Sequence, residues 1–544
     1  MKNVYVIIII TLFTAIACNN DYLEKFPLDR INDATFWNSD ADLALYANQF
    51  YPDLKPSNPN TNSAWSLENP TDNNGPASRF LYSWNEANVP ATGGGWGKGD
   101  WAKIRSCNYA LDHIASMKKN VLVLQYEAEI RFFKAFYYFA KVKYFGDVPW
   151  LEHTLQIDSK ELLGARDSRK TVITNMLKDL DFAVTNLPEK SGADRLTKYA
   201  ALALKSEVCL YEGTFRKYRN LGDFEPMFRA TVDAASTIMS SGLFSVYSTG
   251  KPAEDYFNLF IQDELKGNSE GIMVQRYIKA LRTQSHVRLS NETHAGYTED
   301  FVQTYLCSDG LPISLSLLYK GDAVFGDQFI NRDPRMQQSV YNSDRPYTIY
   351  QDGTKYYKPM PEFSSLRSFT SYYILKGFNP DIRYMETADF GIIDDFIFRY
   401  SKTLLEYAEA KAELNECTQT DLDKSLNLLR DRVKMPHLSI AVGFADPNWP
   451  KWEVSVTPLI NEIRRERRIE LADEGYRWDD LVRWKAGKLL ENIKVVQGAR
   501  DPATGQYRVL YPGFTRVWND RLYLHPIPTQ ELTLNPKLTQ NPGW

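Results

Sequence analysis

Hydrophobic residues recur every three to four positions over several long stretches of the chain, which is the spacing of an α-helix. In one stretch, Phe132, Phe136 and Phe139 lie on one side of the predicted helix. Phe133 and Tyr137 lie on another side, and a helix that is apolar on two sides is buried between neighbours. The same spacing predicts helices over residues 101–118, 127–144, 169–186, 198–212, 225–240, 398–415, 421–434 and 456–485.

The helix ends and the connections indicate how these helices pack. Ser39 and Asp42 form a capping box that opens a further helix, which stops near Pro52. The connections between the helices predicted over 169–240 are short enough for antiparallel neighbours. An Ala followed four positions later by Phe139 and then by a proline partly matches a tetratricopeptide helix. We therefore predict a mostly α fold on a scaffold of tetratricopeptide-like helix pairs.

Two stretches lack helical spacing. Residues 52–100 mix Pro with many Asn, Ser and Gly residues, and long loops of this kind are usually functional or disordered. Over residues 244–394, short Tyr- and Ser-rich runs alternate with Gly and Asp turns. We predict an irregular, loop-rich insert with short strands here, between an N-terminal helical part over 33–243 and a C-terminal helical part with an extended tail over 395–544.

The first residues predict export and a lipid anchor. A basic residue and the apolar run over 4–17 have the charge, length and small-residue ending of a secretory signal, and the run is too short to span a bilayer. Cys18 follows a small residue, as in a bacterial lipoprotein cleavage site, although Ala15 stands where Leu is usual. We predict a signal peptide over 1–17, acylation of Cys18, for example with palmitate, and a polar tether over 18–32. The alternative is an ordinary signal peptide with an incidental cysteine.

Composition narrows the class of protein. Of the 544 residues, 43% are hydrophobic and 24% are charged, values typical of a folded globular chain rather than a disordered one. The 64 basic and 68 acidic residues give a net charge of −4, so no basic surface for nucleic acid is expected. Aromatic residues make up 13%, which exceeds what an ordinary core needs.

No catalytic motif is present in the sequence. The glycine-rich stretch 93–99 fails as a phosphate-binding loop, because a Walker loop needs Gly where Thr92 stands and Ser or Thr where Gly99 stands. The six histidines and five cysteines are scattered without zinc-site spacing, and we expect no essential disulfide. We predict that the protein is not an enzyme and has no cofactor. A glycan-cleaving protein with two distant catalytic acids is the alternative.

Five blocks of sequence match the motifs of one family in order. They are YLEKFPLD and NDATFW at 22–37, EAEIRFFKAFYYF with YFGDVP at 127–149, RY with LLEYAEA at 399–410, IRRERRIELA with GYRWDDLVRW at 463–484, and HPIP with the closing NP and QNPG at 525–543. The chain therefore resembles the SusD/RagB family of nutrient-binding outer-membrane lipoproteins over essentially its whole length.

This resemblance implies a function as well as a fold. Family members sit on the outer face of the outer membrane as a hinged lid over a SusC-like, TonB-dependent transporter. They capture an oligosaccharide for uptake in polysaccharide utilisation, and some RagB-like relatives bind peptide instead. No chemical step is involved. Some relatives bind calcium, but no DxDxDG-like loop supports a calcium site in this sequence.

Sugar binding needs flat aromatic rings beside amides, Arg or carboxylates on loops. Two stretches meet this description, and whether they converge depends on the fold. Trp96 lies among glycines, and we expect its small neighbours to leave the ring exposed. The alternative is that these residues only pin a loop to the scaffold or belong to ordinary solvated loops. The predicted glycan contacts are Trp65, Asn73, Tyr82, Trp84, Asn85 and Trp96 in the first stretch, and Arg282, His286, Asn291 and Tyr297 in the second.

The strongest family blocks are predicted to be architecture. Positive and negative residues alternate over 464–470, which favours a solvated face or salt bridges between helices over an anion-binding patch. Trp478 and Trp484 follow at near-helical spacing among apolar residues, so we expect both rings to pack in the core.

Overall fold

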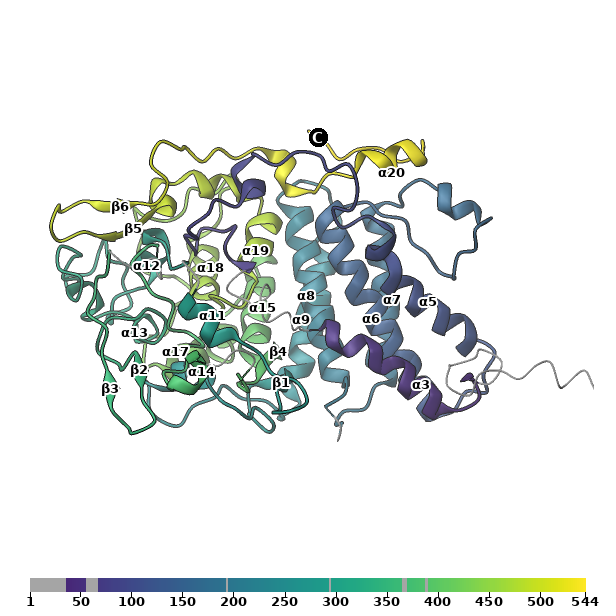
Figure 1. Cartoon of the computed structure of the whole chain (residues 1–544), viewed down its shortest axis with the longest axis horizontal. Helices are drawn as coiled ribbons and strands as arrows, with labels where there is room; N and C mark the ends of the chain where they lie inside the picture. Colours follow the sequence, from purple (N-terminus) through teal and green to yellow (C-terminus); the bar gives the residue numbers. More distant parts are fainter. Residues whose placement is uncertain (1–35, 55–66, 192–193, 293–294, 364–368, 387–389) are drawn as a thin grey trace, which may run out of the picture.

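The computed structural model describes residues 36–544 apart from 55–66, 192–193, 293–294, 364–368 and 387–389. The long helices of the first half stand side by side, on the right of Figure 1, and consecutive helices from α5 to α9 pack against one another. This arrangement confirms the predicted mostly α fold. The helices are α3 (Asp40–Ala47), α5 (Ala102–Ile114), α6 (Val121–Phe145), α7 (Arg169–Asn186), α8 (Lys198–Lys217) and α9 (Glu225–Ser240).

Local sequence explains where these helices begin and end. The Ser39 side chain accepts a hydrogen bond from the backbone N–H of Asp42, and the Asp42 carboxylate accepts one in return, which confirms the predicted capping box. α6 begins after Asn120, whose side chain accepts from the backbone N–H of Val123. It ends at Gly146, where φ is 73°, a backbone conformation that favours glycine.

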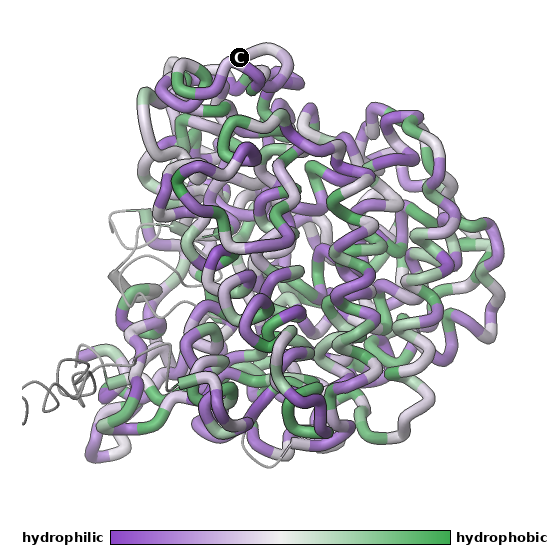
Figure 2. The backbone as a smooth tube through the Cα atoms, turned by 90° about the vertical axis from the view of Figure 1, so that its right-hand side faces the viewer, coloured by the Kyte–Doolittle hydropathy of each residue, from purple (hydrophilic) through white to green (hydrophobic). Residues whose placement is uncertain are grey.

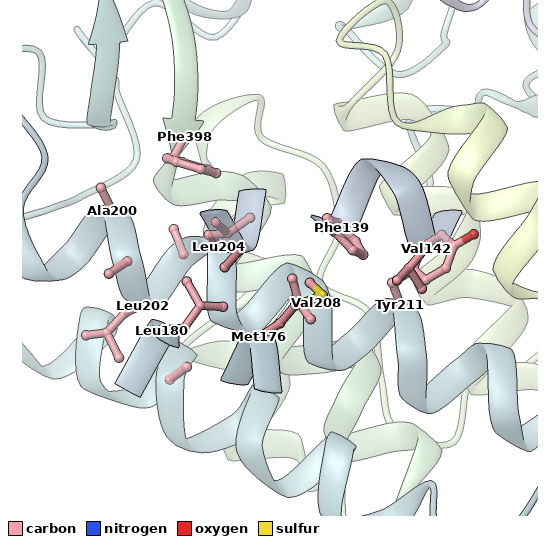
Figure 3. Packing of buried hydrophobic residues seen from close by; sticks show 14 of the residues in the cluster. Phe139, Val142, Met176, Leu180, Ala200, Leu202, Leu204, Val208, Tyr211 and Phe398 are labelled. Atoms are coloured by element: carbon pink, nitrogen blue, oxygen red, sulfur yellow. The ribbon is translucent and has the colours of Figure 1, made fainter. Parts of the chain in front are cut away.

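The main core lies between α6, α7 and α8. Phe132 and Phe133 on α6 are both fully buried, and their rings meet edge to face with centroids 5.5 Å apart. The helix is therefore covered on two sides, as its two apolar stripes predict. Figure 2 shows hydrophobic and hydrophilic residues interleaved along the described backbone. Figure 3 shows the side chains that gather between the three helices: Phe139, Val142, Met176, Leu180, Leu204, Val208 and Tyr211.

The C-terminal part joins this stack through α15, which packs against both α9 and α18. The helix predicted over 456–485 is two helices, because Asp473 and Gly475 between them have left-handed backbone conformations with φ of 59° and 86°. The helix predicted over 421–434 is likewise two shorter ones. The helices of this part are α15 (Tyr400–Glu413), α16 (Gln419–Asp423), α17 (Leu426–Arg432), α18 (Pro458–Glu470), α19 (Arg477–Arg483) and α20 (Thr529–Leu534).

The insert contains short strands, as predicted, and also short helices that the prediction did not include. In the described part of the chain, each sheet has two antiparallel strands: β1 (Gly271–Gln275) with β4 (Asp395–Arg399), β2 (Thr348–Ile349) with β3 (Lys355–Tyr356), and, in the C-terminal tail, β5 (Gln497–Arg500) with β6 (Tyr507–Val509). The short α-helices are α10 (Asp255–Leu259), α11 (His286–Glu292), α12 (Glu299–Thr304), α13 (Met336–Ser339) and α14 (Ile382–Glu386). Among the described residues, the 3₁₀ helices are η2 (Asn48–Asp53), η3 (Leu81–Trp84), η4 (Lys98–Trp101), η5 (Lys160–Leu163), η6 (Asp327–Phe329), η7 (Gly487–Glu491), η8 (Ile493–Val496) and η9 (Asp520–Tyr523).

The alternating charges of α18 are buried rather than solvated. Glu470 is fully buried and accepts hydrogen bonds from Arg432 at 2.6 Å, Arg399 at 2.9 Å and Arg335 at 3.1 Å. Burial alone would raise the pKa of Glu470, but the three guanidinium groups outweigh it and hold that pKa well below its usual range. The expectation of a solvated face is wrong, and that of salt bridges between elements is confirmed. These pairs tie α18 to α17, to β4 and to the insert.

The cysteines Cys107, Cys209, Cys307 and Cys417 are free thiols, and the first three are buried. Burial raises the pKa of Cys209 to about 12, so this thiol behaves as a small apolar side chain of α8.

Among the described residues, no helix combines the length and apolar character that crossing a membrane requires.

Candidate functional site

Four segments that are distant in the sequence meet at one place. Asn74 and Tyr297 form an antiparallel backbone bridge. The backbone N–H of Tyr297 donates to the carbonyl oxygen of Tyr372 at 2.9 Å, and that of Ala499 donates to Thr370 at 2.8 Å. The two stretches predicted to carry the ligand site therefore converge. We call this region the loop junction, and its segments are residues 67–86, 296–298, 369–372 and 497–516.

Partly buried arginines lie beside exposed aromatic rings at the loop junction. Phe514 is 53% exposed, and the guanidinium carbon of Arg79 lies over its ring, 3.7 Å from the centroid. The same guanidinium pairs with Glu86 and lies 5.2 Å from the ring centroid of Trp84. Phe80 is 48% exposed. Rings beside charged hydrogen-bond donors can contact an apolar ligand face and bond to its polar groups at the same time.

A second arginine and its rings adjoin this group. The guanidinium carbon of Arg508 lies 5.8 Å from the ring centroid of Phe363 and 5.5 Å from that of Phe369. Phe369 is 5.7 Å from Tyr511, and the Tyr511 ring meets Trp84 edge-on at 5.0 Å, which links the two groups. We call the whole set the arginine–aromatic surface, and its members are Arg79, Phe80, Phe363, Phe369, Arg508 and Phe514.

Buried charges hold the floor of the loop junction in place. Arg477 donates two hydrogen bonds to the Asp72 carboxylate, at 2.7 and 2.8 Å, and Arg468 lies 3.3 Å from it. Burial alone would raise the pKa of Asp72, but these two arginines keep it below its usual range. Asn73, a predicted glycan contact, is 1% exposed, because it donates to Glu68 at 2.7 Å and accepts from Arg468 at 2.8 Å. It therefore belongs to the floor.

Trp96 is buried, contrary to the prediction from its small neighbours. Only 5% of the residue is exposed, because its ring packs edge-on against Phe145, with centroids 4.9 Å apart, and against Trp101 at 5.4 Å. The indole N–H of Trp101 also donates to the Trp96 carbonyl oxygen at 3.0 Å. The covering rings come from the end of α6 and from the end of η4, directly before α5, so Trp96 pins its loop to the scaffold and presents no free ring face.

The other predicted residues of the first stretch mostly support the loop. Trp84 is 6% exposed and lies under Arg79. Tyr82 stacks on His525, with ring centroids 4.0 Å apart, and burial lowers the pKa of His525 to about 4, so this ring is neutral. Asn85 adopts φ of 60° and accepts from the Arg521 guanidinium at 2.8 Å. These contacts attach the first stretch to the C-terminal tail.

The second predicted stretch is divided between surface and core. Arg282 and His286 are partly exposed, and both lie against the ring of Tyr277, at 5.6 and 6.0 Å. Tyr297 is fully buried, and its hydroxyl donates to a buried carboxylate, so the expectation of a ligand contact there is wrong. Two predicted residues are not placed: Trp65 and the side chain of Asn291 lie outside the described residues.

Most residues of the arginine–aromatic surface were not among the predicted glycan contacts. Phe514 and Arg508 lie in the stretch assigned to an extended tail, and Phe369 lies in the insert outside the two chosen stretches. The available signal was the aromatic spacing over 507–514 beside a glycine turn. In the described ranges, no three His, Cys, Asp or Glu side chains are grouped as metal ligands.

Comparison with known proteins gives consistent matches. A profile described as "SusD family" matches residues 260–544, and one described as "Starch-binding associating with outer membrane" matches residues 21–210. SusD-like protein P38 of Formosa agariphila is 25% identical over 99% of this chain and 99% of its own. A SusD-like protein of Bacteroides fragilis superimposes with a TM-score of 0.74 at 25% identity, over 96% of this chain and 100% of its own. A SusD-like carbohydrate binding protein of the same species gives 0.71 at 23% identity, over 93% and 100%.

Proposed function

The chain belongs to the SusD/RagB family, and we propose that it is a glycan-binding protein of the cell surface that captures oligosaccharides at its loop junction. The observation that carries this proposal is the arginine–aromatic surface, where Phe514 and Phe80 remain about half exposed beside Arg79. Single exposed rings are common on protein surfaces, whereas exposed rings that gather into one patch more often mark a binding site.

Capture at this surface requires no bond to be broken. The apolar C–H face of a sugar ring would stack on Phe514, which removes apolar area from water. Arg79 and Arg508 carry several N–H donors in fixed planes beside the rings, so they would bond the sugar hydroxyls. The floor formed by Asp72 and Arg477 keeps the loops preorganised, which lowers the entropic cost of binding.

We place the protein on the outer face of the outer membrane, anchored by lipid on Cys18, where it would deliver the glycan to a SusC-like, TonB-dependent transporter. The support is the lipoprotein-like sequence around Cys18 and the family membership. The wild type should incorporate labelled palmitate, and Cys18→Ala should abolish this incorporation. Equal incorporation by the variant would contradict the anchor at Cys18.

Affinity gel electrophoresis of the full-length protein against plant, host and microbial polysaccharides tests glycan capture. We expect one glycan class to retard the protein, and Phe514→Ala to weaken that binding about tenfold, which corresponds to about 1.4 kcal/mol. Tyr356→Ala is the matched control, since Tyr356 is a similarly exposed ring, 44% accessible, on β3 outside the loop junction.

The two variants separate the possible results. Retardation that Phe514→Ala weakens and Tyr356→Ala leaves unchanged supports capture at the loop junction. Equal affinity of both variants and the wild type would remove the arginine–aromatic surface from the binding site. A panel without any retardation would reject glycan capture by the isolated protein and favour a peptide ligand.

A further inference from the structure

A cavity of about 510 Å³ lies beside α18, next to the floor of the loop junction. Its wall is formed by the segment 446–452, by one side of α18 and by residues of α12, η7 and η8. Cavities of a few hundred cubic ångströms are the usual size of small-molecule sites. The cavity shares the buried Asp72, Arg468 and Arg477 with the floor of the loop junction, but no residue of the arginine–aromatic surface lines it. The two places therefore present different exposed side chains to a ligand.

Two indole rings line the cavity in fixed orientations. The indole N–H of Trp449 donates to Glu462 at 2.7 Å, and that of Trp452 donates to Asn461 at 2.5 Å. Both acceptors lie on α18, so both rings are tethered to the same helix. Each tryptophan is only partly buried, which leaves apolar ring surface facing the cavity. Tethered rings bind a flat apolar face at a low entropic cost.

The lining carries an excess of positive charge. Seven of its side chains are basic and four are acidic. Two of the acidic side chains already form ion pairs with arginines of the lining. Asp446 pairs with Arg465, and Asp72 pairs with Arg477. By contrast, Lys451 and Lys488 are exposed at the cavity, and the described residues provide neither amino group with a hydrogen-bond or ion-pair partner. An anionic ligand would therefore be attracted.

Arg464 adds an incompletely compensated charge to the same wall. It is 1% exposed, and its guanidinium carbon lies 4.5 Å from the ring centroid of Trp452 and 4.4 Å from that of Trp484. None of its three nitrogens has a hydrogen-bond partner among the described residues. The nearest carboxylate, Glu413, is 3.5 Å away and is shared with Lys217. A buried arginine without hydrogen bonds is costly, and an anion at this wall would reduce that cost.

We propose that this cavity is a second carbohydrate site, which binds a sugar unit bearing a carboxylate or sulfate group. The ring would lie against Trp449 and Trp452, and the anionic group would pair with Lys451 and Lys488 under the positive field of Arg464. Amide side chains at the rim, such as Asn448, can bond the hydroxyls. The proposal extends glycan capture from neutral to acidic saccharides, and it does not require the loop junction to bind sugar.

Isothermal titration calorimetry of the full-length protein tests this site with three probes: a trimer of galacturonic acid, a sulfated galactose trimer and a neutral galactose trimer. We expect at least one acidic trimer to bind at least tenfold more tightly than the neutral one, and to lose affinity steeply as salt is raised. The carboxylate and sulfate probes decide which anionic group is preferred.

Variants locate the binding. Lys488→Ala should weaken the acidic trimer about fivefold or more and reduce the salt dependence, and Trp449→Ala should weaken it about tenfold. Lys266→Ala removes an exposed lysine outside the cavity lining and should change nothing. Lys488 is exposed, so its variant should keep the melting temperature of the wild type, which makes the test independent of folding.

Three results would overturn the proposal. They are no binding of either acidic trimer at millimolar concentration, equal binding of the neutral trimer, and acidic binding that survives Lys488→Ala and Trp449→Ala but is lost in Phe514→Ala. The last result would place the acidic sugar at the loop junction. Acidic binding that only the cavity variants weaken would support the cavity even if the loop junction bound no glycan at all.

Discussion

Replacing Glu409 by Gln should destabilise the protein strongly, because it breaks a buried ion pair while keeping the shape of the side chain. Glu409 accepts two hydrogen bonds from Arg483, at 2.6 and 2.7 Å, and one from the Trp484 indole N–H at 2.7 Å. The Glu409 and Arg483 side chains are 0% and 2% exposed. With a neutral Gln side chain at position 409, Arg483 would lose the Glu409 carboxylate. Its remaining acidic partner would be Asp480, which also pairs with Arg467.

The magnitude follows from leaving a buried charge uncompensated. Removal of one partner of a buried pair typically costs about 3–5 kcal/mol, so we expect a loss of this size in the free energy of unfolding at pH 7. Urea unfolding followed by circular dichroism measures it. Glu416→Gln is the matched control, because Glu416 also pairs with an arginine, Arg229, at 2.9 Å but on the surface. That change should have no measurable effect.

The pH dependence gives a second check on the same pair. Burial alone would raise the pKa of Glu409, but Arg483 outweighs it, so the folded-state pKa lies below the ordinary value. The stabilisation is therefore present above about pH 4, the ordinary carboxyl pKa, and is lost as the pH falls through the folded-state pKa. The difference between wild type and Glu409→Gln should narrow below pH 4. A loss under about 1 kcal/mol at pH 7, or a constant difference down to pH 3, would refute the reasoning.

Three further changes test other parts of the structure. Gly487→Ala should cost about 1–3 kcal/mol in urea unfolding, because its Cβ would lie 1.9 Å from Trp518, whereas Gly99→Ala meets no atom within 4 Å and should not destabilise. Burial raises the pKa of Glu68 to about 8, so the wild type should lose stability relative to Glu68→Gln as the pH rises from 4.5 to 8. A difference in the free energy of unfolding that stays constant over this range would argue against the raised pKa. Thr457→Ala removes the side chain that caps α18 and should lower the free energy of unfolding by about 1 kcal/mol, and no loss would show that the cap contributes nothing.

The bounds of a helix were predictable from the sequence where its capping residues and its hydrophobic spacing agree with its packing in the fold. The bounds expected for 169–186 and 225–240 are those of α7 and α9, because a capping Ser168 opens the first and a proline near its start opens the second. The break between α18 and α19 was not predictable from periodicity. Apolar and charged residues keep helical spacing through it, and only the backbone at Asp473 and Gly475 interrupts the helix.

The candidate site was predictable only in part, because burial depends on contacts between distant segments. The sequence located two stretches that do meet, at Asn74 and Tyr297. It could not show that Phe145 covers Trp96, since the two residues are 49 positions apart, or that the tail places Phe514 beside Arg79. Small neighbours in the sequence therefore do not decide whether a ring in a glycine-rich loop is exposed. The residues that surround the ring in space decide it.

The motifs that identify the family lie apart from the arginine–aromatic surface, although one block also supplies Arg464 to the wall of the cavity beside α18. The block over 463–472 supplies Glu470, which fastens α18 to three other segments, and Arg468, which supports the floor of the loop junction. Both side chains are buried, so their role is to hold the fold together. Phe514 and Arg508, in contrast, lie outside every family block. Sequence similarity in the blocks therefore assigns the scaffold, whereas the choice of glycan has to be sought in the loops that the scaffold brings together.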